Sequence, residues 1–153
     1  MWIELNAAEV KLATYLATSR RTNNRSAGIK DSQQGSQDAI QIDLNGMGAE
    51  LAWCKANNVY PYTDTSRPSK APDGTTRYGM TVDVKHSNNG SYMSIVRWAK
   101  IGDVDCYAMV IGSMPKYKIV GQISAEEALS GKYIRSGERG DYHSIPSTAL
   151  EAY

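Results

Sequence analysis

The sequence contains no phenylalanine, and cysteine and proline are scarce among its 153 residues, with two and five copies. The two cysteines, Cys54 and Cys106, lie far apart within apolar segments. This distribution argues against a disulfide framework and against a cysteine-based zinc site. We therefore expect both to be reduced thiols that pack in the core. Ten tyrosines and three tryptophans supply all the aromatic side chains.

Long hydrophobic runs are also missing, and no apolar segment approaches the roughly 20 residues that cross a bilayer. Residues 1–6 lack the basic start and the apolar stretch of a secretory signal peptide. We therefore expect a cytoplasmic protein without a membrane partner. Neither sign of charge is in excess, since the net charge is +1. This balance argues against a broad basic surface, but it does not exclude a nuclease whose acidic metal site offsets positive charge elsewhere.

The length and an apolar fraction of 41% predict one domain with a single core. Apolar periodicity, caps at Asn6 and Asn45, and turn residues predict a definite order of elements. This order is a helix over 7–19, a connection over 20–43, a helix over 45–58, a connection over 59–72, a hairpin ending near residue 85, strands over 92–98, 106–111 and 117–123, a short helix over 124–129, a loop over 131–141 and a helical turn within 147–153. Such an order predicts an α/β (α+β) fold with one mixed sheet.

A hairpin is predicted after the second helix, because strand-like residues flank the turn Arg77-Tyr78-Gly79. With three turn residues, the glycine takes the left-handed position at the end of the turn. Thr76 then lies opposite Met80, and the same register places Asp73 opposite Asp83. Directly opposed residues have Cβ atoms about 5 Å apart, so these two carboxylates could bind one cation.

Asp83 and Lys85 are two residues apart on the second strand of this hairpin, so their side chains share a face while Val82 and Val84 point into the core. Charged groups backed by valines are costly unless they pair or bind a ligand. Glu50 lies at the rim of the apolar face of the second predicted helix, where it would point along the junction of helix and sheet. Three carboxylates and one ammonium suit Mg²⁺-dependent phosphodiester cleavage, in which the lysine acts on the attacking water or the transition state.

A helix with Glu50, the pair Pro72-Asp73 at a strand start, and Asp83-Val84-Lys85 on the next strand together resemble the PD-(D/E)xK, or restriction-endonuclease-like, nuclease superfamily. Segments 43–55 and 103–112 also resemble small phage-encoded proteins assigned to that superfamily, whose location would be the host cytoplasm. The resemblance implies that Asp73, Asp83 and the backbone carbonyl of Val84 bind Mg²⁺ or Mn²⁺. It implies further that Glu50 supports the metal directly or through water and that Lys85 is catalytic.

The resemblance also implies a restriction-endonuclease-like mixed β-sheet flanked by helices, within a single domain over residues 1–153. We divide the domain into an N-terminal helix plus basic loop (1–43), a catalytic core (44–130) and a C-terminal tail (131–153). The sequence departs from the superfamily in having Asp83 where glutamate is commoner, and in an extra helix before the one with Glu50. An acid-x-lysine triplet alone is weak evidence, since Glu9-Val10-Lys11 fits it on a predicted helix.

These observations predict a metal-dependent DNA endonuclease, with junction resolution, nicking and degradation of host DNA all open. Cutting both strands usually takes two sites, so a homodimer is a candidate assembly besides the complex with DNA. The rival hypotheses are a catalytically silent DNA- or protein-binding module on the same fold, and a phage accessory protein that inhibits a host factor. Metal dependence separates the nuclease from both rivals.

Five cations are candidates for contacts with DNA phosphates, namely Arg20, Arg21, Arg25, Arg97 and Lys100. The alternatives are a solvated loop for the first three and a protected sheet edge for the last two.

The remaining titratable residues are expected to be structural. His86 points away from Lys85, and His143 lies in a polar segment where we expect it to be exposed. Asp103 and Asp105 open a strand and are expected to serve turn and edge hydrogen bonds rather than a metal.

Overall fold

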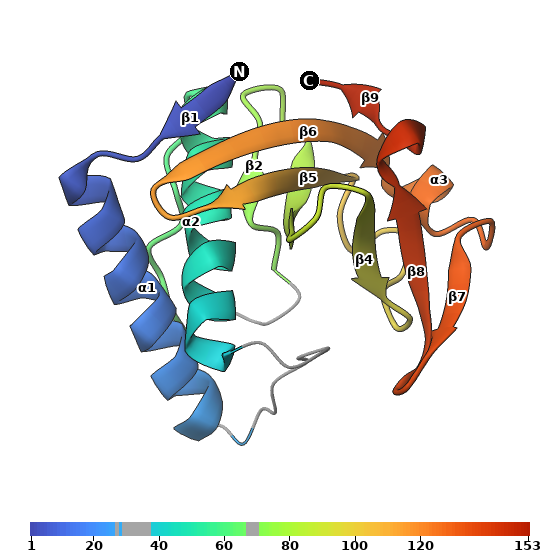
Figure 1. Ribbon diagram of the computed structural model, residues 1–153, viewed down its shortest axis with the longest axis horizontal. Coiled ribbons are helices and arrows are strands. Elements are labelled where there is room, and N and C mark those ends of the chain that lie inside the picture. Colours follow the sequence, from blue (N-terminus) through green and yellow to red (C-terminus); the bar gives the residue numbers. More distant parts are fainter. Residues whose placement is uncertain (27, 29–37, 67–70) are drawn as a thin grey trace.

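The computed structural model describes residues 1–26, 28, 38–66 and 71–153. Helices and strands are mixed along the chain, which is of the α+β class (Figure 1). The elements are β1 (Trp2–Glu4), α1 (Ala7–Ser26), α2 (Ala39–Asn57), β2 (Gly74–Thr75), β3 (Thr81–Ser87), β4 (Tyr92–Val96), β5 (Cys106–Ser113), β6 (Lys116–Ser124), α3 (Ala125–Ala128), β7 (Ile134–Gly137), β8 (Gly140–Pro146), the 3₁₀ helix η1 (Ser147–Ala149) and β9 (Glu151–Ala152).

The strands form two sheets. The larger sheet has the order β1-β6-β5-β3-β2, and β9 pairs with the part of β6 that β1 leaves open. It is mixed, because β3 and β5 run parallel while the neighbouring pairs run antiparallel. The smaller sheet is antiparallel, with the order β4-β8-β7. The predicted mixed sheet is thus confirmed, but the prediction of a single sheet is wrong, since β4 pairs with β8 instead.

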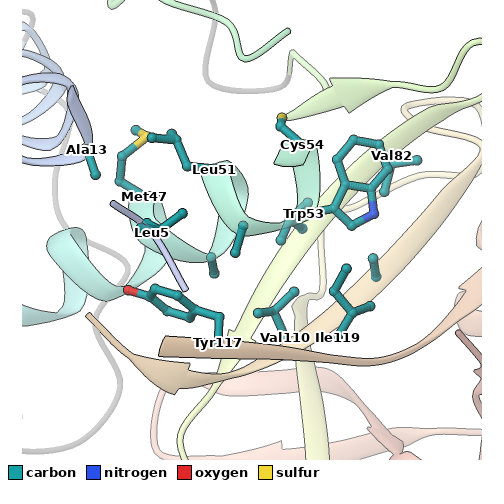
Figure 2. Close-up of a cluster of buried hydrophobic side chains, with 14 of the residues drawn as sticks. Leu5, Ala13, Met47, Leu51, Trp53, Cys54, Val82, Val110, Tyr117 and Ile119 are labelled. Atoms are coloured by element: carbon teal, nitrogen blue, oxygen red, sulfur yellow. The ribbon is translucent and has the colours of Figure 1, made fainter. Parts of the chain in front are cut away.

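Two apolar clusters lie on opposite faces of the larger sheet. Alternate residues of β5 point to opposite faces, so Ala108 and Val110 face α2 whereas Tyr107 and Met109 face the smaller sheet. In Figure 2, Trp53 of α2 lies over the strands of the first cluster. The second cluster also contains Met93, Ile95 and Ile145 from the smaller sheet. Both cysteines are buried in the first cluster as thiols, as predicted.

Helix α1 is longer than predicted. Its start is as expected, since the side chains of Asn6 and Glu9 each accept a hydrogen bond from the other's backbone N–H. It continues to Ser26 instead of ending near residue 19. The last turns have no apolar periodicity, and they are held by polar contacts with distant segments, such as the ion pair of Arg21 with Asp43. The predicted loop over residues 20–26 is therefore wrong.

Helix α2 begins earlier than predicted. Asp38 caps it by accepting a hydrogen bond from the N–H of Ile40 at 3.0 Å, whereas the predicted cap, Asn45, lies inside the helix. The rest of the predicted connection, residues 27 and 29–37, falls outside the described residues. Two glycines, Gly46 and Gly48, lie within α2, and packing requires the second of them. A Cβ on Gly48 would lie 2.0 Å from the hydroxyl oxygen of buried Tyr117.

Gly46 and Gly48 therefore provide a matched test of this packing. Gly46→Ala should stabilise the protein by about 0.5–1 kcal/mol, because a Cβ there meets no atom within 4 Å and alanine favours a helix interior. Gly48→Ala should destabilise it by about 1–3 kcal/mol, because the Tyr117 ring must move. Urea unfolding of both variants and the parent measures the difference. Equal effects would show that α2 does not pack on β6 in this way.

The C-terminal region differs most from prediction. Residues 131–141 were expected to form a loop, but they contribute β7 and the start of β8. All four residues of β7 are exposed, so the segment lacks the apolar alternation that marks a strand. His143 was expected to be exposed and is only 8% exposed on β8, where burial lowers the pKa of its imidazole. The predicted short helix is confirmed as α3, capped by Ser124.

Candidate active site

The predicted hairpin is formed by β2 and β3 with the predicted turn. Thr75 pairs with Thr81, the N–H of Thr76 donates to the carbonyl oxygen of Met80 at 2.8 Å, and Gly79 has φ +86°. The ladder ends at the next pair, Gly74 with Val82. The register that the sequence predicts is therefore confirmed over the paired residues.

Asp73 lies directly beyond the end of this ladder and contacts β3 on both sides of Asp83. Its N–H donates to the carbonyl oxygen of Val82 at 2.9 Å, and its carboxylate accepts from the N–H of Val84 at 2.8 Å. The ladder therefore does not extend to a regular Asp73–Asp83 pair. The Asp73 carboxylate accepts the hydrogen bond from the N–H of Val84, which a longer β2 would otherwise accept with its backbone. The carbonyl of Val84 points to the same edge as its N–H, as it does in any extended strand.

Helix α2 is fixed against the start of β2 by a close aromatic contact. A Cβ on Gly74 would lie 2.3 Å from the ring of Trp53, so only glycine lets the backbone beside Asp73 approach the helix this closely. Trp53 and Glu50 are three residues apart and share one side of α2. The Trp53–Gly74 contact therefore brings Glu50 next to Asp73.

Two cations neutralise part of the acid cluster. Lys85 Nζ lies 2.9 Å from Asp83 Oδ1, with the side chains 29% and 27% exposed. Arg20 Nη1 of α1 lies 3.0 Å from Glu50 Oε1, with the side chains 23% and 15% exposed. The four predicted site residues are thus gathered where β3, the start of β2 and α2 meet, and Arg20 joins them from α1.

The electrostatics of the cluster are strongly coupled. Burial raises the pKa of Asp73 well above its ordinary value, and the negative charges of Glu50 and Asp83 raise it further. Burial alone would lower the pKa of Lys85, but the attraction of Asp83, Asp73 and Glu50 outweighs it and the net pKa is raised. Lys85 is therefore held as an ammonium, which favours electrostatic stabilisation over a role as general base in the metal-free protein.

The acids do not lie in ligand positions for an ion. Within residues 1–26, 28, 38–66 and 71–153, no three side chains of His, Cys, Asp or Glu form a group that could hold a metal. Glu50 and Asp83 instead meet the cations described above. The donor set still fits a hard divalent ion, because three carboxylates and a backbone carbonyl supply oxygen ligands, and the charges of Glu50 and Asp83 add to the effect of burial in raising the pKa of Asp73.

A separate cavity of about 340 Å³ lies between α1 and α2. Its lining includes Thr18, Arg21, Arg25, Ile40 and Asp43. The residues of the acid cluster do not line it, so it is not the site predicted from the sequence.

The five predicted DNA-binding cations occupy two regions. Arg20, Arg21 and Arg25 belong to α1 instead of a basic loop. Arg97 and Lys100 are exposed on the connection after β4, not at the end of a longer strand. Arg20 and Arg21 form ion pairs with α2, the Arg97 guanidinium lies beside Gly140 at the start of β8, and the N–H of Lys100 donates to Asp103.

The other polar residues have structural contacts. His86 Nε2 lies 2.6 Å from the carbonyl oxygen of Gly112. Asp105 accepts from the N–H and the hydroxyl of Thr81 at 2.8 and 3.0 Å, and Asp103 accepts from the N–H of Lys100 at 3.0 Å. These contacts agree with the predicted turn and edge roles of the two aspartates.

Comparisons with known proteins add no assignment. No family model matches the sequence, and no curated protein matches it. Among the described helices, none is long and apolar enough to cross a membrane.

Sequence reasoning missed Arg20 as a neighbour of Glu50 and missed Trp53 and Gly74 as the residues that position them. Arg20 is 30 residues from Glu50, and its local sequence is simply polar. One feature of the sequence indicates the Trp53–Gly74 contact, namely the glycine directly after Asp73. The neighbouring residues do not indicate which ring this glycine accommodates.

Proposed function

We propose that this chain is a metal-dependent deoxyribonuclease with a restriction-endonuclease-like core. The observation that carries the proposal is the position of Asp73 at the open edge of β3, hydrogen-bonded on both sides of Asp83, with Glu50 and Lys85 electrostatically coupled to it. The α+β class and the hairpin that presents both aspartates support the same core.

The proposed ligands are Asp73, Asp83 and the carbonyl of Val84, with Glu50 in support, for Mg²⁺ or Mn²⁺. When bound, such a cation supplies Lewis-acid polarisation of the phosphate and a bound water of lowered pKa. In the hydrolysis, the water oxygen forms a bond to phosphorus, the bond between phosphorus and the leaving deoxyribose oxygen breaks, and the proton lost by the water is matched by one gained at that oxygen. The ammonium of Lys85 stabilises the negative charge that develops on the phosphate oxygens.

A second candidate function is a catalytically silent DNA- or protein-binding module on the same fold. The observation in its favour is that Glu50 and Asp83 each meet a cation of the chain itself, and that no group arranged for a metal is found among the described residues. This function requires no divalent ion.

Incubation with supercoiled plasmid, linear duplex and branched DNA, each with Mg²⁺, Mn²⁺ or EDTA, tests the proposal. Cleavage that needs the divalent ion and disappears in the Asp83→Asn variant, purified in parallel, is the expected result. DNA binding without cleavage in any metal would instead establish the silent module. The cleaved DNA form distinguishes nicking, double-strand cutting and junction resolution.

Arg21 and Arg25 should contribute to DNA affinity through their charge. The double variant Arg21→Ala/Arg25→Ala should bind DNA more weakly, and its affinity should fall less steeply with salt, because up to two fewer counterions are released. Fluorescence anisotropy with a labelled duplex between about 50 and 200 mM salt measures the slope. A slope equal to that of the parent would remove both arginines from the DNA-binding surface.

A further inference from the structure

Two adjacent arginines of α1 form ion pairs with α2, and their surroundings differ. Arg20 meets Glu50 at 3.0 Å, and the Glu50 side chain is 15% exposed. Arg21 meets Asp43 at 2.8 Å, and the Asp43 side chain is 37% exposed. The two arginines are themselves buried to a similar degree, at 23% and 19% exposure. They therefore form a matched pair in which only Arg20 belongs to the acid cluster.

The side of α1 that carries Arg20 also contacts Thr65, which lies outside both helices. Asn23, one turn beyond Arg20, donates to the backbone carbonyl and the hydroxyl of Thr65 at 3.1 and 3.0 Å. Arg21 instead lines the cavity between α1 and α2, where it pairs with Asp43. The orientation of α1 thus presents one arginine to the candidate active site and the next to a separate cavity.

Among the described residues, Lys85 and Arg20 are the cations that form ion pairs with the acids of the cluster. Glu50, Asp73 and Asp83, taken as ionised, carry three negative charges, and Lys85 and Arg20 supply two positive ones. A divalent cation and one phosphodiester add +2 and −1, so the sum over these described groups is zero with Arg20 and −1 without it. A guanidinium also has five N–H donors in a planar fork, so it can contact a carboxylate and a phosphate oxygen together.

We propose that Arg20 belongs to the active site, where it neutralises Glu50 in the metal-free protein and donates to a non-bridging oxygen of the scissile phosphate in the complex with DNA. The inference rests on the proposed function and deepens it, because it adds a residue on α1 to the four predicted ones. It differs from a general role in DNA affinity, since the contact is with the phosphate that is cleaved.

The experiment compares Arg20→Met with Arg21→Met in the full chain. Arg20→Met should bind Mn²⁺ more tightly than the parent, by up to about fivefold, because the ion no longer competes with the guanidinium for Glu50. The same variant should lower kcat for DNA cleavage roughly 10- to 100-fold, because a charge-assisted hydrogen bond to the phosphate is lost. Arg21→Met should raise KM for DNA and leave the Mn²⁺ affinity at the parental value. Calorimetric titration with Mn²⁺ and plasmid cleavage kinetics give the two readouts.

The opposite signs of the two effects identify an active-site role. Reduced Mn²⁺ affinity together with a lowered melting temperature would make Arg20 a structural link between the helices and overturn the inference. Parental values of both Mn²⁺ affinity and kcat would also overturn it, while leaving the nuclease function intact. A parent protein that binds no Mn²⁺ and cuts no DNA would instead overturn the proposed function. If Arg20→Met fails to fold, Arg20→Gln replaces it in the test, because glutamine is neutral but can still donate to Glu50. Arg20→Gln should lower kcat in the same way, and a parental kcat would reject the inference.

Discussion

Replacing Lys85 with alanine is expected to lower the rate of DNA cleavage about 10²–10³-fold, while the fold is retained and the affinity for a divalent ion is not lowered. The ammonium is not a metal ligand, and the neighbouring carboxylates raise its pKa, so at neutral pH it acts as a fixed positive charge beside Asp83. Losing it removes stabilisation of the developing phosphate charge. Cleavage rates across a range of Mg²⁺ concentrations measure the effect.

Lys132 provides the control for this experiment. It forms an ion pair with Glu127 at 2.8 Å, of the same kind as the Lys85–Asp83 pair, but on the exposed loop after α3. Lys132→Ala should therefore cleave DNA at the parental rate and keep its metal dependence. If Lys85→Ala also cleaves at that rate, the activity belongs to another site and the mechanism proposed above is wrong.

Asp73→Asn is expected to raise the melting temperature of the metal-free protein at pH 7–8 by a few degrees. A gain of about 1 kcal/mol in the free energy of unfolding corresponds to roughly 2–4 °C in a chain of this length. Burial and the charges of Glu50 and Asp83 raise the pKa of Asp73, so its charged form costs folding free energy. Because the pKa of Asp73 is raised in the folded state, this residue costs no stability below the pKa that it has in the unfolded chain. The cost appears as pH rises from that pKa through the folded-state pKa. The advantage of asparagine should therefore vanish near pH 3.

The same variant separates metal binding from folding. Mn²⁺ should stabilise the parent and have little effect on Asp73→Asn, because one ligand charge is gone. Asp73→Ala is the matched control, since it removes the charge and also the acceptor for the N–H of Val84, which asparagine can keep. It should be less stable than Asp73→Asn at every pH. Melting curves between pH 3 and 8, with and without Mn²⁺, provide the test, and a parent more stable than Asp73→Asn at pH 8 without metal would contradict it.

The parts of the structure that the sequence predicts well are those in which a short segment specifies its own geometry. The turn at 77–79 depends on one glycine, and α3 depends on the Ser124 cap. The approach of Asp73 to Asp83 follows from that turn, although the side chain of Asp73 ends the ladder in a way that register alone does not indicate.

The parts that it does not predict depend on partners distant in the chain. Strand β7 is exposed at every position, so only its pairing with β8 defines it. Arg20 lies in a polar run, and its place beside Glu50 follows from how α1 lies on α2. The position of Glu50 itself was inferred from the apolar face of α2, but the contact of Trp53 with Gly74 that fixes it joins two separate segments.

The pairing of β4 with β8 has a consequence for how the chain reaches its folded state. Met93 lies opposite Ile145, 52 residues later, and both are fully buried in the second cluster. Once Met93 and Ile95 have been synthesised, they have no strand to pair with until residues 140–146 have emerged, so this apolar surface stays open to water and to other chains while residues 97–146 are added. The first cluster, built around α2, needs no part of β8. The side of the larger sheet that carries Asp83 and Lys85 is therefore covered only after β8 has emerged.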